Sequence, residues 1–180
     1  MRIISGFLKA RRFTVPKNFP SRPTTNFAKE GLFNILGNRI DLFDLKILDL
    51  CAGTGNITFE FISRQAGEIT AVDSHPNCLR YIQKNAIELG IKDLVTTVKE
   101  DIIKFVQRTD QKFDLIFTDP PYGYPHYEEL IRVIFERELL TEDGLLIVEH
   151  SRDTKLEHLP QFEFCRTFGN VYFSFFKVQV

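Results

Sequence analysis

The stretch ILDLCAGTGNITFE, residues 47–60, decides the fold. It starts as a short apolar strand, turns through Gly53-Thr54-Gly55 and continues into a helix from Asn56. A buried strand that leads through a glycine-containing turn into a helix is typical of open α/β sheets, whose ligands bind at the carboxyl ends of the strands. The stretch therefore predicts a largely parallel sheet with a ligand site at one edge.

The same alternation of strand and helix continues along the chain. Apolar runs predict strands at 46–50, 68–72, 94–98, 113–118 and 144–149, with helices between them at 56–64, 76–89, 101–108 and 127–139. Such alternation implies right-handed crossovers and a mostly parallel sheet covered on both faces. The last two runs, 162–168 and 171–178, flank Gly169-Asn170 and predict an antiparallel hairpin. We expect a doubly wound α/β domain with a C-terminal hairpin.

The N-terminal residues follow a different pattern. Two short strand-like pieces, 2–7 and 12–15, precede a proline-punctuated stretch at 16–23, which predicts a short basic β-hairpin extension over residues 1–23. The main domain is then expected to span residues 24–180. Thr24 or Thr25 is expected to cap a first helix, whose apolar face would include Phe27, Leu32, Ile35 and Leu36.

Composition narrows the class of protein. With 43% hydrophobic and 26% charged residues over 180 positions, the chain is an ordinary soluble globular sequence of one-domain size. No apolar run approaches the roughly 18 residues of a membrane span, and the start, MRIISGFLKARR, lacks the cleavage site of a signal peptide. Cys51, Cys78 and Cys165 are scattered, which argues against a zinc site or a disulfide framework. We expect a reduced, cytoplasmic protein without a metal.

Charge is distributed unevenly along the chain. Residues 1–29 contain seven basic residues and no acid, so the net charge of −1 divides into +7 there and −8 over the other 151 residues. A basic segment on an acidic body is compatible with a polyanionic partner, and equally with a solvated basic surface. The seven residues are Arg2, Lys9, Arg11, Arg12, Lys17, Arg22 and Lys29.

Acidic residues follow the first three predicted strands, where a cofactor would bind. A dinucleotide would favour Gly-x-Gly-x-x-Gly, but the third glycine position holds Thr58. S-adenosylmethionine needs no pyrophosphate site. Asp49 is placed for its amino group, Asp73 for both ribose hydroxyls and Asp101 for the adenine amine. The alternative interpretation is structural, with Asp49 as a strand-end cap and the other two as helix N-caps.

A second motif, Asp119-Pro120-Pro121-Tyr122, follows the fourth predicted strand. Methyl transfer to a planar exocyclic amine needs two acceptors for the two N–H groups, because the nitrogen lone pair is delocalised into the ring. The Asp119 carboxylate and the Pro120 carbonyl can supply them. The prolines stiffen the loop, and Tyr122 offers a flat face for an unstacked base. The alternative interpretation is a proline-rich turn with a helix-capping acid.

These motifs resemble the class I S-adenosylmethionine-dependent methyltransferases that carry Asp-Pro-Pro-Tyr. More narrowly, the chain resembles the bacterial small-subunit rRNA guanine-N2 methyltransferase family. The resemblance spans nearly the whole chain and is carried by RIISGFLKARRF (2–13), RPTTNFAKEGLFNIL (22–36), LDLCAGTGNITFEFISR (48–64), DPPY (119–122) and FGNVYFSFFKV (168–178).

The resemblance implies that the protein methylates N2 of one guanine in 16S rRNA within a partly assembled small subunit, with S-adenosylhomocysteine as product. We expect a monomer. The resemblance implies that Asp119 and Pro120 hold the amine and that Tyr122 holds the base; the catalytic motif also includes Pro121. The implied cofactor residues are Asp49, Cys51, Ala52, Gly53, Thr54, Gly55, Asp73, Ser74, Asp101 and Ile102. The implied RNA contacts are Arg2, Lys9, Arg11, Arg12 and Arg22.

Three other functions stay open at this point. An adenine-N6 methyltransferase acting on RNA or DNA would share the cofactor loop and the Asp-Pro-Pro-Tyr motif. A nicotinamide oxidoreductase is disfavoured by Thr58, and a non-enzymatic RNA-binding factor has no need of Asp119. Glu149 ends the fifth predicted strand near the site, where a structural and a functional role are equally compatible with the sequence.

Overall fold

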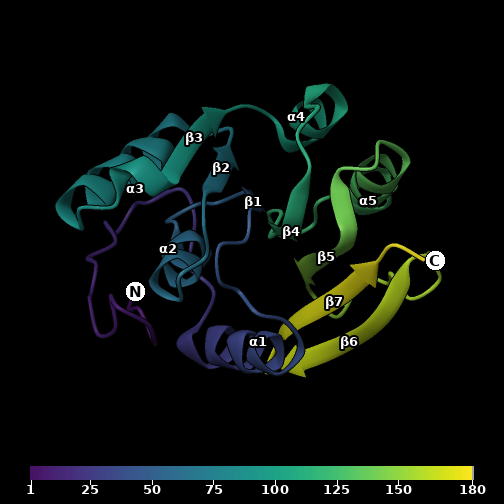
Figure 1. Ribbon diagram of the computed structural model, residues 1–180, viewed down its shortest axis with the longest axis horizontal. Coiled ribbons are helices and arrows are strands. Elements are labelled where there is room, and N and C mark those ends of the chain that lie inside the picture. The colour runs from purple at the N-terminus through teal and green to yellow at the C-terminus, as the bar shows by residue number, and fades with distance from the viewer. Residues whose placement is uncertain (180) are drawn as a thin grey trace.

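A seven-stranded sheet forms the centre of the molecule, in the order β3-β2-β1-β4-β5-β7-β6 (Figure 1). The computed structural model describes residues 1–179. The first five strands run parallel, and β7 and β6 add an antiparallel hairpin beside β5. The strands are β1 (Ile47–Leu50), β2 (Ile69–Asp73), β3 (Val95–Lys99), β4 (Phe113–Thr118), β5 (Leu140–His150), β6 (Phe162–Phe168) and β7 (Val171–Lys177).

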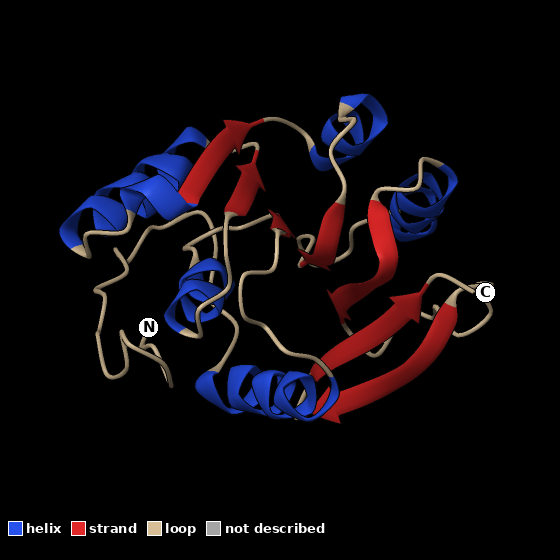
Figure 2. Ribbon diagram, viewed as in Figure 1, coloured by secondary structure: helices blue, strands red, loops and turns tan. Residues whose placement is uncertain are grey.

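Helices cover both faces of the sheet (Figure 2). Two apolar clusters, one on each face, hold the layers together. Three helices contribute to the first cluster: α1 (Asn26–Arg39), α2 (Asn56–Ser63) and α3 (Pro76–Glu88). Two helices contribute to the second: α4 (Ile102–Arg108) and α5 (Tyr127–Glu136). A short 3-10 turn, η1 (Lys92–Leu94), leads into β3.

The doubly wound architecture predicted from the sequence is confirmed, and β4 and β6 match their predicted ranges. The largest difference lies between α5 and β5. The helix ends at Glu136 rather than at residue 139, and β5 begins at Leu140 rather than at residue 144. Glu138 takes a left-handed conformation with φ 53°, which a helix of L-residues cannot continue. The amide of Phe113 then donates to the Leu139 carbonyl, so the chain joins the sheet earlier than its apolar pattern indicates.

The predicted N-terminal hairpin is reduced to one antiparallel bridge between Arg2 and Arg12. Instead of forming a strand, the amides of Ile4 and Ser5 donate to the Glu60 carboxylate of α2, at 2.9 and 3.1 Å. Because these two donors are satisfied by a side chain, Ile4 and Ser5 have no need of a strand partner. The extension is nevertheless packed on the domain, since Ile3 and Leu8 belong to its first apolar cluster.

Helix α1 begins where the sequence predicts, with Thr25 as its cap. Its apolar face differs from the prediction at Phe27, which is 66% exposed and packs edge-on against Phe168. Lys29 is one of the seven basic residues of the N-terminal segment, yet its side chain is fully buried 3.2 Å from Glu60. The positive charge of Lys29 is therefore neutralised inside the protein and is not part of a basic surface.

Across residues 1–179, the helices are all too short or too polar to pass through a lipid bilayer.

Candidate active site

Three carboxylates lie on one face of the sheet near the carboxyl ends of adjacent strands. Asp49 is in β1, Asp119 directly follows β4, and Glu149 is in β5. Paired residues of neighbouring strands point to the same face. Thr118 pairs with Val148, so the next residues, Asp119 and Glu149, lie side by side on the opposite face. The Asp119 amide donates to the Leu50 carbonyl at 3.2 Å, which continues the pairing of β4 with β1 by one residue.

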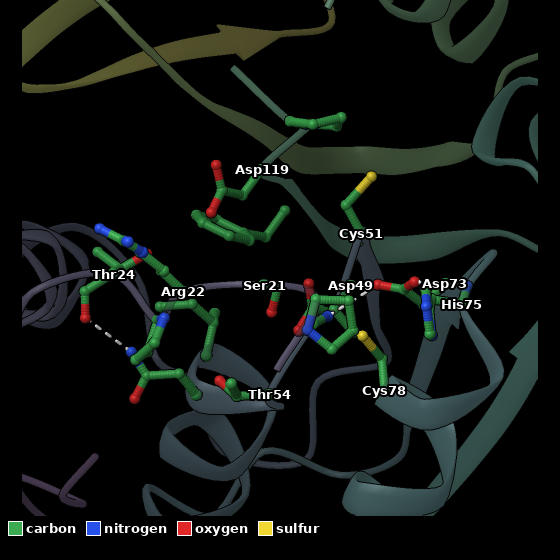
Figure 3. A pocket seen from close by; sticks show the side chains of 18 of the residues that line it. Ser21, Arg22, Thr24, Asp49, Cys51, Thr54, Asp73, His75, Cys78 and Asp119 are labelled. Atoms are coloured by element: carbon green, nitrogen blue, oxygen red, sulfur yellow. Dashed lines mark hydrogen bonds between the residues drawn. The ribbon is translucent and has the colours of Figure 1, made fainter. Parts of the chain in front are cut away.

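A cleft of about 250 Å³ opens over these strand ends (Figure 3). In Figure 3, Asp49 lies between Asp119 on one side and Asp73 with His75 on the other. The cleft is lined by segments from the N-terminal extension, the β1–α2 loop, the β2–α3 loop and the start of the loop after β4. Its lining residues are Pro20, Ser21, Arg22, Pro23, Thr24, Asp49, Cys51, Ala52, Gly53, Thr54, Asn56, Ile57, Asp73, Ser74, His75, Cys78, Phe117, Asp119 and Pro121.

Asp49 is held at the bottom of this cleft by α2. Its carboxylate is 1% exposed and accepts a 2.6 Å hydrogen bond from the Thr58 hydroxyl. Burial raises the pKa of Asp49 to about 7, and the Thr58 hydrogen bond acts in the opposite direction. A buried carboxylate with a raised pKa gains most when a cation arrives to pair with it. Asp49 is therefore suited to hold an ammonium group.

The loop between β1 and α2 depends on its two glycines. Gly53 and Gly55 have φ of 56° and 78°, a region that L side chains rarely adopt. A Cβ on Gly53 would lie 2.5 Å from the Ser21 hydroxyl oxygen, and one on Gly55 would lie 2.8 Å from Phe59. The Gly53 amide donates to Asp73 at 2.9 Å, which connects the loop to the end of β2. The loop thus brings backbone close to the cleft without filling it.

Asp73 retains capacity for a ligand although both of its oxygens are engaged. One oxygen accepts from the Gly53 amide and the other from the His75 amide, each at 2.9 Å. Because each carboxylate oxygen accepts about two hydrogen bonds, both can still accept from a pair of ribose hydroxyls. Asp73 does not cap α3; His75 takes that position. The structural alternative for Asp73 is therefore wrong.

These residues fit S-adenosylmethionine. Asp49 offers a carboxylate for the ammonium group of its methionine part, and Asp73 offers one for the two hydroxyls of its ribose. The glycine loop between them leaves room for the cofactor. The loop lacks the third glycine that a dinucleotide favours, because that position holds Thr58, whose hydroxyl donates to Asp49.

Asp119 lies at the opposite side of the cleft from Asp73. Asp119 is half-buried, and its carboxylate accepts no hydrogen bond from any donor within residues 1–179. Burial, followed by the negative charges of Glu149 and Asp49, raises the pKa of Asp119 well above its usual value. An acid whose pKa is perturbed by burial and by charged neighbours, and whose oxygens are free to accept from a ligand, is a candidate for function.

The loop after Asp119 presents the rest of the motif. Pro120 is buried, while Tyr122 is 85% exposed, so its ring is open to a base. A turn closes the loop, with the Tyr124 amide donating to the Pro121 carbonyl at 3.0 Å and Gly123 at φ 78°. Two prolines and a hydrogen-bonded turn restrict the backbone directly beside the Asp119 carboxylate.

Segment 20–24, which the sequence pattern did not place at the site, forms one wall of the cleft. The Thr24 hydroxyl donates to Glu149 at 2.8 Å, and the Thr24 carbonyl accepts from the Asn56 side chain at 2.9 Å. Asn56 in turn accepts from the buried Lys29 ammonium at 2.8 Å. The signal was present in Arg22-Pro23-Thr24, a motif that marks the family resemblance. Arg22, predicted to contact RNA, lines this cleft.

Most of the predicted cofactor residues come together, with three exceptions. Gly55, Asp101 and Ile102 do not line the cleft. Asp101 is the N-cap of α4 and accepts from the Lys104 amide at 3.1 Å, as the structural alternative states. Its contact with adenine stays a prediction. Of the predicted catalytic residues, Asp119 and Pro121 line the cleft, whereas Pro120 and Tyr122 belong to the adjoining loop.

The predicted RNA contacts differ in accessibility. Lys9, Arg11, Arg12 and Arg22 are exposed, whereas Arg2 is partly buried. The carbonyl of Arg2 accepts a hydrogen bond from the buried Lys29 ammonium. RNA binding by these residues stays a prediction.

The fold and the cleft define a class I S-adenosylmethionine-dependent methyltransferase. The sheet order, the acids near the carboxyl ends of β1 and β2, and the Asp-Pro-Pro-Tyr motif after β4 all belong to that class. Within it, the chain belongs to the family described as Conserved hypothetical protein 95, whose model matches residues 1–177.

Relatives by sequence extend over most of the chain. YlbH of Bacillus subtilis, named as a candidate rRNA methyltransferase, is 31% identical over 87% of this chain and 85% of its own. Ribosomal RNA small subunit methyltransferase D of Escherichia coli is 29% identical over 89% of this chain and 79% of its own. A tRNA1(Val) (adenine(37)-N6)-methyltransferase of Haemophilus influenzae is 35% identical, but over only 49% of this chain and 39% of its own.

Solved structures support the fold. The Escherichia coli protein yhhF superposes with a TM-score of 0.84 at 24% identity, over 99% of each chain. The Podospora anserina methyltransferase PaMTH1, solved with S-adenosylhomocysteine bound, gives a TM-score of 0.69 at 12% identity, over 87% of this chain and 80% of its own.

Proposed function

We propose that this protein transfers a methyl group from S-adenosylmethionine to the exocyclic N2 amine of a guanine in 16S rRNA of the small ribosomal subunit. The Bacillus subtilis and Escherichia coli relatives, both named as rRNA methyltransferases, support an rRNA substrate. The assignment of guanine N2 rests on the family resemblance of the N-terminal motifs.

The observation that carries the proposal is the Asp119 carboxylate, which faces the cleft without a hydrogen-bond partner among residues 1–179. An exocyclic amine would supply the missing donor. When Asp119 accepts one N–H and the neighbouring Pro120 carbonyl accepts the other, the nitrogen lone pair is drawn out of conjugation with the ring. The amine then becomes nucleophilic, which is the main chemical obstacle to methylating it.

The reaction needs positioning more than it needs a covalent intermediate. The cofactor supplies a methyl group already activated by its sulfonium. The amine nitrogen forms a bond to the methyl carbon as the carbon–sulfur bond breaks, and the nitrogen loses one proton to Asp119 or to water. The restricted loop at 119–124 holds the base against the cleft, and bringing reactants to about 3–3.5 Å in the right orientation accounts for a large part of such rate enhancements.

The N-terminal extension supplies the surface for the RNA backbone. Lys9, Arg11 and Arg12 are exposed, and Glu60 fixes the residues that precede them to the domain. A basic group on a fixed element can position the RNA as well as attract it. The target nucleotide must leave its stack to enter the cleft, and the exposed Tyr122 ring offers it a new stacking surface.

Adenine-N6 methylation is the second candidate. It is favoured by the 35% identity to a tRNA adenine-N6 methyltransferase over 49% of this chain. The two acceptors at Asp119 and Pro120 would serve an adenine amine as well as a guanine amine.

The test is methyl transfer to small subunits from a strain that lacks the enzyme. The purified protein is incubated with these subunits and isotopically labelled S-adenosylmethionine, and the 16S rRNA is digested for nucleoside mass spectrometry. We expect label in N2-methylguanosine. Label in N6-methyladenosine would establish the second candidate, and absence of label in either nucleoside would reject both. Subunits already modified by the enzyme serve as the control and should accept no label.

A further inference from the structure

The mechanism above makes no use of Glu149, although this residue adjoins its central carboxylate. Glu149 is 8% exposed and is in β5, immediately after the residue that pairs with the end of β4. One of its oxygens accepts the 2.8 Å hydrogen bond from Thr24. Its other oxygen has no donor within residues 1–179. Like Asp119, Glu149 thus has an oxygen with unused capacity to accept a hydrogen bond.

The two acids are placed to meet one flat molecule. Neighbouring strands lie about 4.8 Å apart, and the side chains of Asp119 and Glu149 project from the same face of adjacent strands. Asp119 lines the cleft, as does Thr24, the hydrogen-bond partner of Glu149. A base whose amine reaches Asp119 would therefore present the neighbouring atom of its edge toward Glu149.

The bases differ at that neighbouring atom. In guanine, the N2 amine adjoins N1–H, so two donors stand side by side. In adenine, the N6 amine adjoins N1, and in cytosine the N4 amine adjoins N3; both ring nitrogens are acceptors. An ionised carboxylate only accepts hydrogen bonds. It matches the guanine edge and repels the other two.

We propose that Glu149 selects guanine, by accepting a hydrogen bond from N1–H while Asp119 accepts from the N2 amine. The inference rests on the proposed function, because it takes the guanine N2 amine as the methyl acceptor. It also supplies what the Asp-Pro-Pro-Tyr motif lacks, since Asp119 and Pro120 do not distinguish one exocyclic amine from another.

The hydrogen bond from Thr24 favours the acceptor role of Glu149. Burial raises the pKa of Glu149 to about 7, and the hydrogen bond from Thr24 counteracts this shift. Thr24 is itself held in place, because its carbonyl accepts from Asn56 and Asn56 accepts from Lys29. The Thr24 hydroxyl therefore orients the carboxylate and stabilises its charged form.

The test compares two bases at the target nucleotide, once mass spectrometry of the natural product has located it. Small subunits are reconstituted with 16S rRNA that carries either guanine or 2-aminopurine there. The analogue keeps the N2 amine but has no hydrogen on N1. The wild-type enzyme should methylate the 2-aminopurine particle with a kcat/KM about 10- to 150-fold lower, the effect of losing one hydrogen bond to a charged group.

Glu149→Gln provides the matched change, because an amide can donate to the unprotonated N1 of 2-aminopurine. We expect this variant to lose activity on the guanine particle, so that the ratio of kcat/KM for guanine over 2-aminopurine falls toward one or below it. The control is Asp153→Asn at an exposed position, which should keep the wild-type ratio. A purely structural role of Glu149 would lower both rates together and leave the ratio unchanged. That unchanged ratio would overturn the inference.

Two further outcomes distinguish a failure of the Glu149 inference from a failure of the proposed function. If the wild-type enzyme methylates both particles equally, Glu149 does not read N1–H, and this result does not depend on whether the variant folds. If natural subunits acquire no N2-methylguanosine at all, the proposed function itself fails before any variant is made.

Discussion

The Lys29 ammonium lies 3.2 Å from the Glu60 carboxylate, and both side chains are completely buried. Glu60 also accepts hydrogen bonds from the Ile4 and Ser5 amides and from the Arg64 guanidinium. One acid in α2 thus fixes both the N-terminal extension and helix α1. Burial lowers the pKa of Lys29, and the negative charge of Glu60 opposes that shift.

Removing the Glu60 carboxylate should destabilise the protein strongly. In Glu60→Ala, the buried ammonium loses its counter-ion and two amides lose their acceptor, and breaking a buried pair in this way typically costs about 3–5 kcal/mol. Urea unfolding followed by circular dichroism measures the change. Glu68→Ala is the control, because Glu68 forms an exposed pair with Lys46 and should cost less than about 1 kcal/mol. Equal losses in the two variants would contradict the anchoring role of Glu60.

Replacing the central acid of the site should separate catalysis from cofactor binding. Asp119→Asn keeps the size of the side chain but removes its charge, so the amine loses its strongest acceptor. We expect turnover to fall by at least about 100-fold, as for removal of other groups that stabilise a transition state. Affinity for S-adenosylmethionine, measured by calorimetry, should stay within about threefold of wild type, since Asp49 and Asp73 are untouched. Wild-type turnover in this variant would disprove the assignment.

Cofactor affinity should rise with pH. Asp49 has a pKa of about 7 in the free protein, and the ammonium group of the cofactor favours its ionised form. Binding at pH 6 must therefore release a proton, and affinity should increase by up to about tenfold per pH unit until pH 7, then level off. Calorimetry in two buffers of different ionisation enthalpy counts the proton. Asp49→Asn should bind weakly and lose this proton release.

Asp49 also makes the stability of the free protein depend on pH, but stability should fall with rising pH whereas cofactor affinity rises. Since the folded-state pKa lies above the unfolded value, the folded state binds more protons between about pH 4 and 7. The contribution of Asp49 to the free energy of unfolding therefore declines as pH rises through that window. Asp49→Asn should remove this component of the decline, and an unchanged profile would show that the carboxyl is already ionised.

Charge removal on the extension should change the salt dependence of RNA binding. Removing one ion pair between a basic side chain and an RNA phosphate reduces the slope of log affinity against log salt by about 0.7–0.9. Arg11→Ala/Arg12→Ala should therefore lower the slope by up to twice that amount without changing stability, because both side chains are exposed. Filter binding to 16S rRNA over a salt series measures it. Arg152→Ala, exposed on another part of the chain, should leave the slope unchanged.

Local patterns carried most of the fold. The strands and helices were predictable because each apolar run lies next to a turn or cap that ends it, as with Thr25 before α1 and Gly53-Thr54-Gly55 before α2. The acids at strand ends were predictable for the same reason, since topology alone brings Asp49, Asp73 and Asp119 to one edge.

Interactions between distant parts of the chain were not predictable from such patterns. The amides of residues 4 and 5 reach an acid 55 or more positions away, and these hydrogen bonds replaced the expected N-terminal strands. Thr24 looked like a possible helix cap, but its partner is Glu149. Lys29 looked like a surface charge because its acceptors, Glu60 and Asn56, are in another helix.

The hydrogen bond between Thr24 and Glu149 joins residues 125 positions apart. Because interactions at such separation form only after long loops have closed, the wall at segment 20–24 is completed late in folding. During synthesis, the first two β–α units leave the ribosome well before Glu149 does. The cofactor cleft therefore acquires its final shape only when more than four-fifths of the chain has been made.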